Sequence, residues 1–384
     1  MDAAAAIDWQ TAQRVGELMA GSAPTGRMPV RSVQPLAHDF ARRVSEYTGL
    51  ELSRELPPLE AVDRPGWIAA NLRTMRPLLE SMERAKQDAN GSRGLLSGPV
   101  EAVSGHVLGA QLGAVTGLLS QRVLGQYDIS LLDPSATPRL LLLEPNLLAA
   151  SRTLKVDREQ LLAWVAIHEI THAVQFSGAP WLQEHLASLL RELLQGLQVA
   201  VGGSSGEPSG EGSAAAGGKD TAGEQGQSGG RFPDPRELLR WAREGELQAL
   251  IERARHGELL RLTLGEDRWR LVERMQATMS LIEGHAEHTM DAVGAELLPG
   301  LPRLRIAMDR RRESRGLPWR VLERLLGLEL KMRQYEAGRS FCDHVVEQAG
   351  VETLALAWRS PAELPSGQEI AQPAQWLARM SIPA

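Results

Sequence analysis

Hydrophobic positions recur at helical spacing through most of the chain, so the sequence predicts a mainly α-helical protein. Apolar residues three or four positions apart, with polar residues between them, are typical of helices packed on a core. Leu, Ala and Arg are abundant and aromatic residues other than Trp are scarce, which also favours helices over strands. Besides the motif-bearing helix described below, helices are expected over residues 8–20, 36–48, 68–75, 104–125, 181–199, 236–255, 267–293, 303–313, 318–335 and 337–349.

Glycines at every fourth position mark the predicted helix 104–125: Gly105, Gly109, Gly113 and Gly117. On a helix they form one smooth ridge, against which a second helix can pack very closely. Such ridges also occur in membrane helices. Polar residues interrupt this segment, however, and its apolar runs are far shorter than the roughly 20 residues of a membrane span. We therefore expect a tightly packed interior helix and no membrane span.

Two short apolar segments before the motif-bearing helix predict a β-hairpin. Residues 127–131 and 139–143 are separated by the turn-rich connector 133–138. A strand edge at this place could pair with an extended peptide through backbone hydrogen bonds. A purely structural hairpin explains the pattern equally well, and the sequence leaves both interpretations open.

The composition changes abruptly at residues 201–230, which contain eleven glycines and no large apolar residue after Val201. Such a segment cannot bury enough apolar surface to fold, so a flexible Gly/Ser-rich insertion is predicted. Because helical patterning resumes beyond it, we expect one domain over residues 1–384 with the insertion inside it.

Charge and cysteine content narrow the class of protein. The net charge of -6 gives no general attraction to nucleic acid, and the eight arginines between Arg303 and Arg324 are interleaved with acidic residues. The single Cys342 excludes an internal disulfide and fits a reducing compartment. The acidic start lacks the layout of a signal peptide, so a cytoplasmic protein is expected. No phosphate-binding loop, dinucleotide fingerprint or G-x-S-x-G elbow appears.

The strongest chemical signal lies in a helix with clear start and stop signals. Asp157 followed by Gln160 resembles a capping box, and the apolar run 161–167 comes next. Gly178, with Pro180 just beyond, predicts where this helix ends.

This helix carries His168-Glu169-Ile170-Thr171-His172. His168 and His172 are one turn apart, so both imidazoles project from one face and can bind one metal ion. Glu169 is placed to take a proton from a water at that metal rather than to ligate it, which is the arrangement of a zinc hydrolase. Two solvent-facing histidines on an amphipathic helix are the alternative. The apolar flanks argue against it, because polar groups inside a buried run need partners.

Several segments together resemble a known family and cover nearly the whole chain outside 201–230. They are Asp63–Trp67, Gly109–Gly113, Val123–Asp128, Glu144–Asn146, Trp164–Phe176, Pro180–Leu182, Glu283–Gly294 and Lys331–Tyr335. In this order they resemble the zincin-like family of bacterial hydrolases, which includes a branch associated with coenzyme F420 biosynthesis. The resemblance implies a single, mostly helical zinc metallopeptidase-like domain. It implies no substrate, and nothing in the sequence matches a deazaflavin site.

Glu283 is the predicted third metal ligand. The extended H-E-x-x-H-x-x-G-x-x-H pattern fails, because Gln175 and Gly178 stand at its glycine and final histidine. His185 lies beyond the helix end, in a Leu-rich stretch. The helix 267–293, in contrast, brings Glu283 toward the core.

The surroundings of this glutamate support the assignment. Asp267 can cap its helix, and the apolar residues that precede Glu283 would face the core: Leu271, Val272, Met275, Met279 and Ile282. Gly284 removes a side chain where the two metal-bearing helices must approach. Glu287 and Asp291 follow along the same face and could orient the imidazoles. His285 and His288 are the alternative ligands.

These patterns predict a Zn2+-dependent hydrolase, with a metallopeptidase as the first expectation and Glu169 as general base. A peptide or amide is the expected substrate, and His285, His288 and Tyr335 are candidates to stabilise the oxyanion. Two alternatives stay open. One is a zinc-stabilised scaffold or binding protein without turnover, and the other is a non-peptide amide hydrolase acting on a cofactor precursor.

Overall fold

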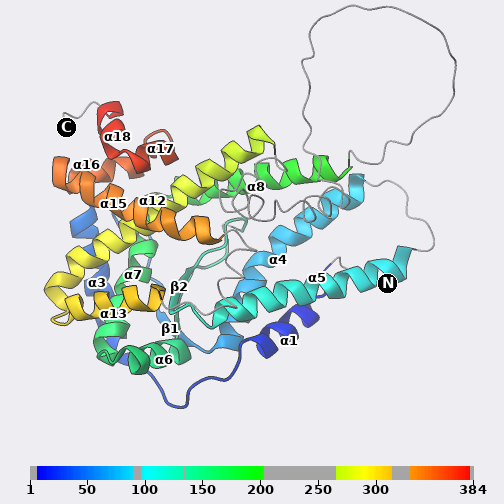
Figure 1. Cartoon of the computed structure of the whole chain (residues 1–384), viewed down its shortest axis with the longest axis horizontal. Coiled ribbons are helices and arrows are strands. Elements are labelled where there is room, and N and C mark those ends of the chain that lie inside the picture. Colours follow the sequence, from blue (N-terminus) through cyan, green and yellow to red (C-terminus); the bar gives the residue numbers. More distant parts are fainter. Residues whose placement is uncertain (1–6, 90–96, 134, 203–264, 314–327, 381–384) are drawn as a thin grey trace, which may run out of the picture.

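The structure, a computed structural model, describes residues 7–89, 97–133, 135–202, 265–313 and 328–380 (Figure 1). These residues are mostly helical, as predicted, with a small three-stranded sheet. The helices are α1 (Trp9–Met19), α2 (Val30–Val33), η1 (Gln34–Leu36), α3 (Ala37–Thr48), α4 (Arg64–Ala89), α5 (Ser97–Ser120), α6 (Glu144–Leu154), α7 (Arg158–Gly178), α8 (Trp181–Gly202), α12 (Glu266–Leu297), α13 (Leu301–Glu313), α15 (Leu328–Ala349), α16 (Val351–Leu354), η2 (Ala355–Trp358), α17 (Gly367–Ala371) and α18 (Pro373–Arg379). The strands are β1 (Leu59–Val62), β2 (Gly125–Asp128) and β3 (Arg139–Leu143).

The sheet has the order β1-β3-β2, with β1 parallel and β2 antiparallel to β3. The predicted hairpin is therefore present, although its first strand starts two residues before the predicted range and ends at Asp128. β1 was not predicted, because a four-residue strand is defined by its partner about 80 residues away rather than by its own pattern. The fully buried side chains of β3 alternate between two hydrophobic clusters, as a strand covered on both faces requires.

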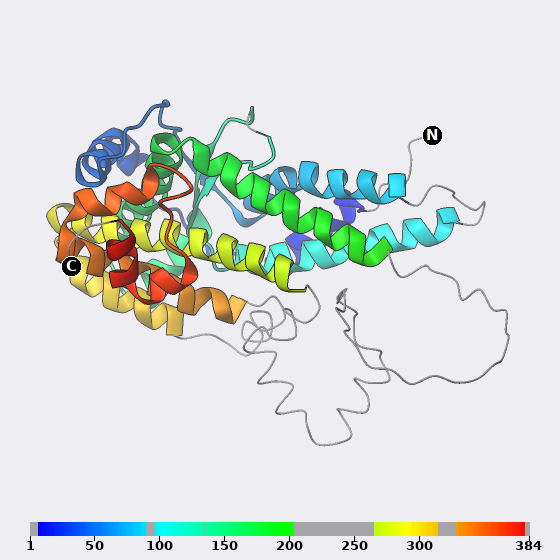
Figure 2. The ribbon, with the colours of Figure 1, turned by 90° about the horizontal axis from the view of Figure 1, so that it is seen from above.

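The glycine ridge of α5 packs against α1, as predicted. A Cβ added at Gly113 or Gly117 would collide with the backbone of α1, and one at Gly109 with the backbone of its N-cap residue Asp8. Glycine therefore allows the two helices to touch along their backbones. The helices α4, α5 and α8 extend together away from the C-terminal helices (Figure 1, Figure 2). Among the described helices, none is long and apolar enough to cross a membrane.

Helix α7 lies next to α3, α12 and β2 (Figure 1). Asp157 caps it by accepting a 2.9 Å hydrogen bond from the backbone N–H of Gln160. In a capping box, the Gln160 side chain would accept from the backbone N–H of Asp157. Here Oε1 of Gln160 accepts instead from the backbone N–H of Gly300. Nearly every residue from Leu161 to Gln175 is buried, so this helix is a core element and not a surface helix.

Helix α15 packs on α12 immediately behind Glu283. Gly284 and Gly338 make the close approach possible, since a Cβ on either residue would overlap the opposite backbone. This packing also explains why α15 is continuous, where the sequence predicted a break at residue 336. A glycine inside a helix lowers the stability of that helix, and the packing of α15 on α12 at Gly338 offsets this cost.

Other boundaries differ from the prediction. Helix α4 continues to Ala89, past the expected end near Met75 and through Pro77. Helix α12 begins after Gly265 without a side-chain cap, so the expected capping role of Asp267 is wrong. The predicted helix 236–255 and the insertion 201–230, apart from its first two residues, lie outside the described residues.

Candidate metal centre

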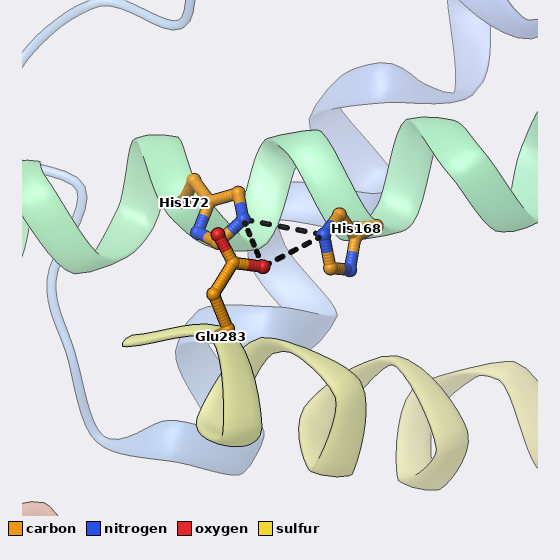
Figure 3. A group of neighbouring side chains, drawn as sticks. All are labelled: His168, His172 and Glu283. Carbon is orange, nitrogen blue, oxygen red and sulfur yellow. Dashed lines mark hydrogen bonds and ion pairs between the residues drawn. The ribbon is translucent and has the colours of Figure 1, made fainter. Parts of the chain in front are cut away.

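The side chains of His168, His172 and Glu283 meet between α7 and α12 (Figure 3). The two Nε2 atoms lie 3.2 Å apart. Oε2 of Glu283 lies 3.7 Å from Nε2 of His168 and 3.8 Å from Nε2 of His172. Among the described residues, these three form the group of His, Cys, Asp and Glu side chains close enough to share a metal ion.

This triangle fits a tetrahedral zinc ion. With bonds of roughly 2.0–2.1 Å, neighbouring ligand atoms of a tetrahedral site stand about 3.3 Å apart. The observed separations of 3.2 to 3.8 Å are close to that value, and two imidazole nitrogens with one carboxylate oxygen are a usual donor set for zinc. The side chains of His168 and Glu283 are 22% and 27% exposed, so one side of the triangle remains accessible to water.

Gln175 determines which nitrogen of His172 faces the group. The Nε2 amide of Gln175 donates to the backbone carbonyl of Ile282 at 2.9 Å, and a carbonyl can only accept. Oε1 of Gln175 is therefore the atom 2.8 Å from Nδ1 of His172, and that Nδ1 must carry the proton. The lone pair of His172 is left on Nε2, toward Glu283 and His168.

The same amide orients His285, which is not part of the triangle. Nδ1 of His285 accepts from Nε2 of Gln175 at 2.9 Å, and burial lowers the pKa of His285 to about 3. Its ring packs edge-on against Trp358, with 4.8 Å between centroids. His285 is a neutral, buried histidine behind Gln175 and not a member of the candidate ligand set.

His288 is also engaged elsewhere. Asp343 can only accept, so Nδ1 of His288 donates to Oδ1 of Asp343 at 2.6 Å, and Nε2 shares a 2.7 Å hydrogen bond with the hydroxyl of Tyr47. The hydrogen bond from His288 lowers the pKa of Asp343. Both ring nitrogens of His288 are used to tie α12 to α3 and α15.

The expected orienting role of Asp291 is wrong. Its carboxylate forms ion pairs with Arg305 and, at 3.0 Å, with Arg339, and not with an imidazole of the triangle. The residue that orients His172 is Gln175, which the sequence argument used only to exclude a ligand pattern. Its position three residues after His172, on the same helical face, was the available signal. The side chain of Tyr335, an oxyanion candidate, lies outside the described residues.

Glu169 lies beside the triangle, against the edge of β2. Its Oε2 accepts a 2.8 Å hydrogen bond from the backbone N–H of Tyr127. A Cβ on Gly125 would come within 2.7 Å of Oε1 of Glu169, so glycine leaves the room that this side chain occupies. Burial raises the pKa of Glu169 to about 7, and the charge of Glu283 acts in the same direction.

The carboxylates make this place favourable for a cation. Burial lowers the pKa of His168, but its close pairing with Glu283 and the negative charge of Glu169 outweigh burial and raise that pKa to about 9. Burial lowers the pKa of His172. A divalent cation would satisfy both carboxylates and both imidazoles at once, so the residues present fit zinc.

Comparisons with known proteins give a family and a similar solved structure. A family model described as a zincin-like metallopeptidase matches residues 7–377. The chain is similar to a protein from Chloroflexus aurantiacus whose crystal structure is described as that of an inferred hydrolase with a novel fold. The two share 26% sequence identity with a TM-score of 0.63, over 98% of this chain and 100% of the other. No curated protein matches the chain.

Proposed function

The chain belongs to the zincin-like metallopeptidase family, and on that basis we propose that it is a zinc-dependent hydrolase that cleaves peptide bonds. The observation that carries the proposal is the triangle of His168, His172 and Glu283 with the carboxylate of Glu169 beside it. The similarity to the Chloroflexus aurantiacus protein, described as an inferred hydrolase, supports the same reaction class.

His168, His172 and Glu283 would hold the metal in this mechanism. When bound, zinc supplies a Lewis acid that lowers the pKa of a water toward about 7 and polarises the scissile carbonyl. The hydrogen bond from His172 to Gln175 keeps Nε2 of His172 in the unprotonated form that a metal needs.

Glu169 would act as the general base and then as the acid. Its carboxylate takes a proton from the attacking water and passes it to the leaving amine, which cannot depart as an anion. The backbone N–H of Tyr127 binds Oε2, so Oε1 remains for the proton transfer.

The alternative of a zinc-stabilised scaffold explains less of this arrangement. Burying a carboxylate costs free energy unless it is paired, and a structural zinc site has no need of a base beside it. Glu169 is only 6% exposed and donates no ligand atom to the triangle. Hydrolysis of a non-peptide amide would use the same residues, so a cleavage assay is needed to distinguish the two substrate classes.

The test is metal analysis of the purified protein together with cleavage of a peptide library. We expect about one zinc per chain, cleavage that stops when the zinc is removed by a chelator, and recovery of cleavage when zinc is added back. Bound zinc without cleavage of peptides or simple amides would instead support the scaffold.

A further inference from the structure

We propose that a pocket next to Glu169 binds a large apolar side chain of the substrate, on one side of the bond that is cleaved. The pocket has a volume of about 470 Å³ and lies between the second half of α7, β2 and the segment before β1. This inference rests on the proposed function, because it concerns the same reaction centre.

Helical periodicity places the pocket on the face of α7 that carries Glu169. Ala173 and Phe176 line it, and they follow Glu169 at positions i+4 and i+7, on the same face of α7. One helical turn is about 5.4 Å, which is within reach of a side chain adjacent to the scissile bond. Tyr127 lines the same pocket, and its backbone N–H binds Glu169. The pocket and the general base therefore share a wall.

The lining is mostly apolar. Tyr127 and Phe176 pack against each other, with 5.9 Å between ring centroids, and together form one aromatic side of the pocket. The other apolar lining residues are Leu52, Leu56, Pro57, Pro58, Pro138 and Ala173. The volume falls within the roughly 300–1,000 Å³ of small-molecule pockets, which leaves room for an aromatic or long aliphatic side chain.

The charges at the rim do not select a charged side chain. Arg139 and Glu60 neutralise each other through two hydrogen bonds of 2.6 and 3.0 Å. The adjacent Arg54 and Glu55 are both exposed and of opposite sign. Burial raises the pKa of the Tyr127 hydroxyl to about 12, so this wall is neutral at physiological pH. Apolar burial is then the main source of binding free energy in this pocket.

The size of the side chain at position 173 affects the free volume of the pocket. Ala173 directly follows the candidate ligand His172, and its methyl group leaves space along α7. A leucine there would fill this space without adding charge. Phe176→Ala would do the opposite and remove one of the two rings of the aromatic side. Neither residue belongs to the metal triangle. Ala173 is buried next to His172, so the zinc content of each variant is measured beside its probe affinities.

Three zinc-chelating probes test the inference on the zinc-loaded full chain. They are hydroxamic acids with the same metal-binding group and a methyl, a 2-phenylethyl or a 2-carboxyethyl substituent, with Kd measured by calorimetry. We expect the phenylethyl probe to bind at least about tenfold tighter than the other two, since burying an aromatic ring contributes that much or more. Phe176→Ala and Ala173→Leu should each reduce this preference to less than about threefold and leave the Kd of the methyl probe unchanged.

Leu18→Ala is the matched control, because Leu18 is 80% exposed and lies on α1. Binding of the methyl probe with no preference for the phenylethyl probe overturns the pocket and leaves the proposed function standing. A preference that survives in both pocket variants, with normal zinc content, overturns it too. No binding of any probe to the zinc-loaded protein overturns the metal centre, and the pocket inference falls with it.

Discussion

The backbone N–H of Tyr127 donates a 2.8 Å hydrogen bond to Oε2 of Glu169, so the edge of the sheet holds the carboxylate proposed as the general base. The bond from the N–H of Leu143 to the carbonyl of Leu124 directs the backbone of Leu124 toward β3. Backbone groups alternate along an antiparallel strand, so those of Tyr127 point to the open side of β2. A peptide pairing with β2 at this position would have to displace the protein's own carboxylate.

The first prediction concerns the room that Gly125 leaves for Glu169. In Gly125→Ala, the new Cβ would approach Oε1 and Cγ of Glu169 within 2.7 and 2.8 Å and displace the side chain. We expect kcat for a cleaved peptide to fall about 100-fold, because a small misplacement of a catalytic group is costly. Zinc content should stay unchanged. Gly367→Ala, where a Cβ would meet no atom within 4 Å, is the control. Full activity in Gly125→Ala would contradict the positioning role.

Replacing the general base is the second prediction. Glu169→Gln keeps the shape of the side chain and removes its ability to take a proton, so hydrolysis should fall by roughly 100- to 10,000-fold. Metal analysis should still find about one zinc per chain. Glu159→Gln, an exposed change in the first turn of the same helix, should leave the rate unaltered. If Glu169→Gln retains substantial activity, the assigned mechanism is wrong.

The third prediction separates the candidate ligands on α12. Glu283→Gln replaces a charged metal ligand with a neutral one. It should weaken zinc binding by more than the roughly 10- to 100-fold typical of replacing a residue that only hydrogen-bonds a ligand. His285→Ala and His288→Ala should have smaller effects, because Nδ1 of His285 and both ring nitrogens of His288 are bonded to other partners. A competition titration with a zinc chelator gives the three affinities. Loss of zinc in a histidine variant, with binding retained in Glu283→Gln, would reverse the assignment.

Gln175 gives a fourth prediction, on the protonation of His172. Gln175→Leu leaves Nδ1 of His172 without its acceptor, so zinc affinity should fall roughly 10- to 100-fold. Gln175→Glu keeps an acceptor oxygen and should recover part of that loss. NMR of the metal-free protein should show His172 protonated on Nδ1 in the wild type, and a mixture of tautomers in Gln175→Leu. Unchanged tautomer and affinity in Gln175→Leu would show that Gln175 only fills space.

The fifth prediction is a pH dependence of stability. The hydrogen bond from His288 lowers the pKa of Asp343 below its usual 3.8, so the folded state favours the charged carboxylate. This stabilisation is present above about pH 4 and is lost as pH falls through the lowered pKa. Asp343→Asn should therefore lower Tm at pH 7, and the difference from wild type should shrink below pH 4. The exposed Asp309→Asn is the control. A difference that is constant with pH would mean that charge plays no part.

The sequence alone was sufficient for those features that depend on local spacing. The helical period predicted most helices, and the ridge of Gly109, Gly113 and Gly117 predicted close packing of α5. The spacing of His168 and His172 placed both imidazoles on one face of a helix. Glu283 was selected because its own helix carried an apolar face, and the structure brings it to the two histidines. Whether these residues bind zinc stays a prediction for the experiments above.

Only the tertiary structure decided which side chains meet across elements distant in sequence. The orientation of His172 depends on the carbonyl of Ile282, which lies 107 residues from Gln175 in sequence. The position of Glu169 depends on β2, and β1 exists only because β3 offers it hydrogen-bonding partners. Local patterns specify a helix and the face it buries, because neighbouring side chains and backbone bonds determine both. Hydrogen bonds between elements depend on angles and distances that arise only when the whole core packs.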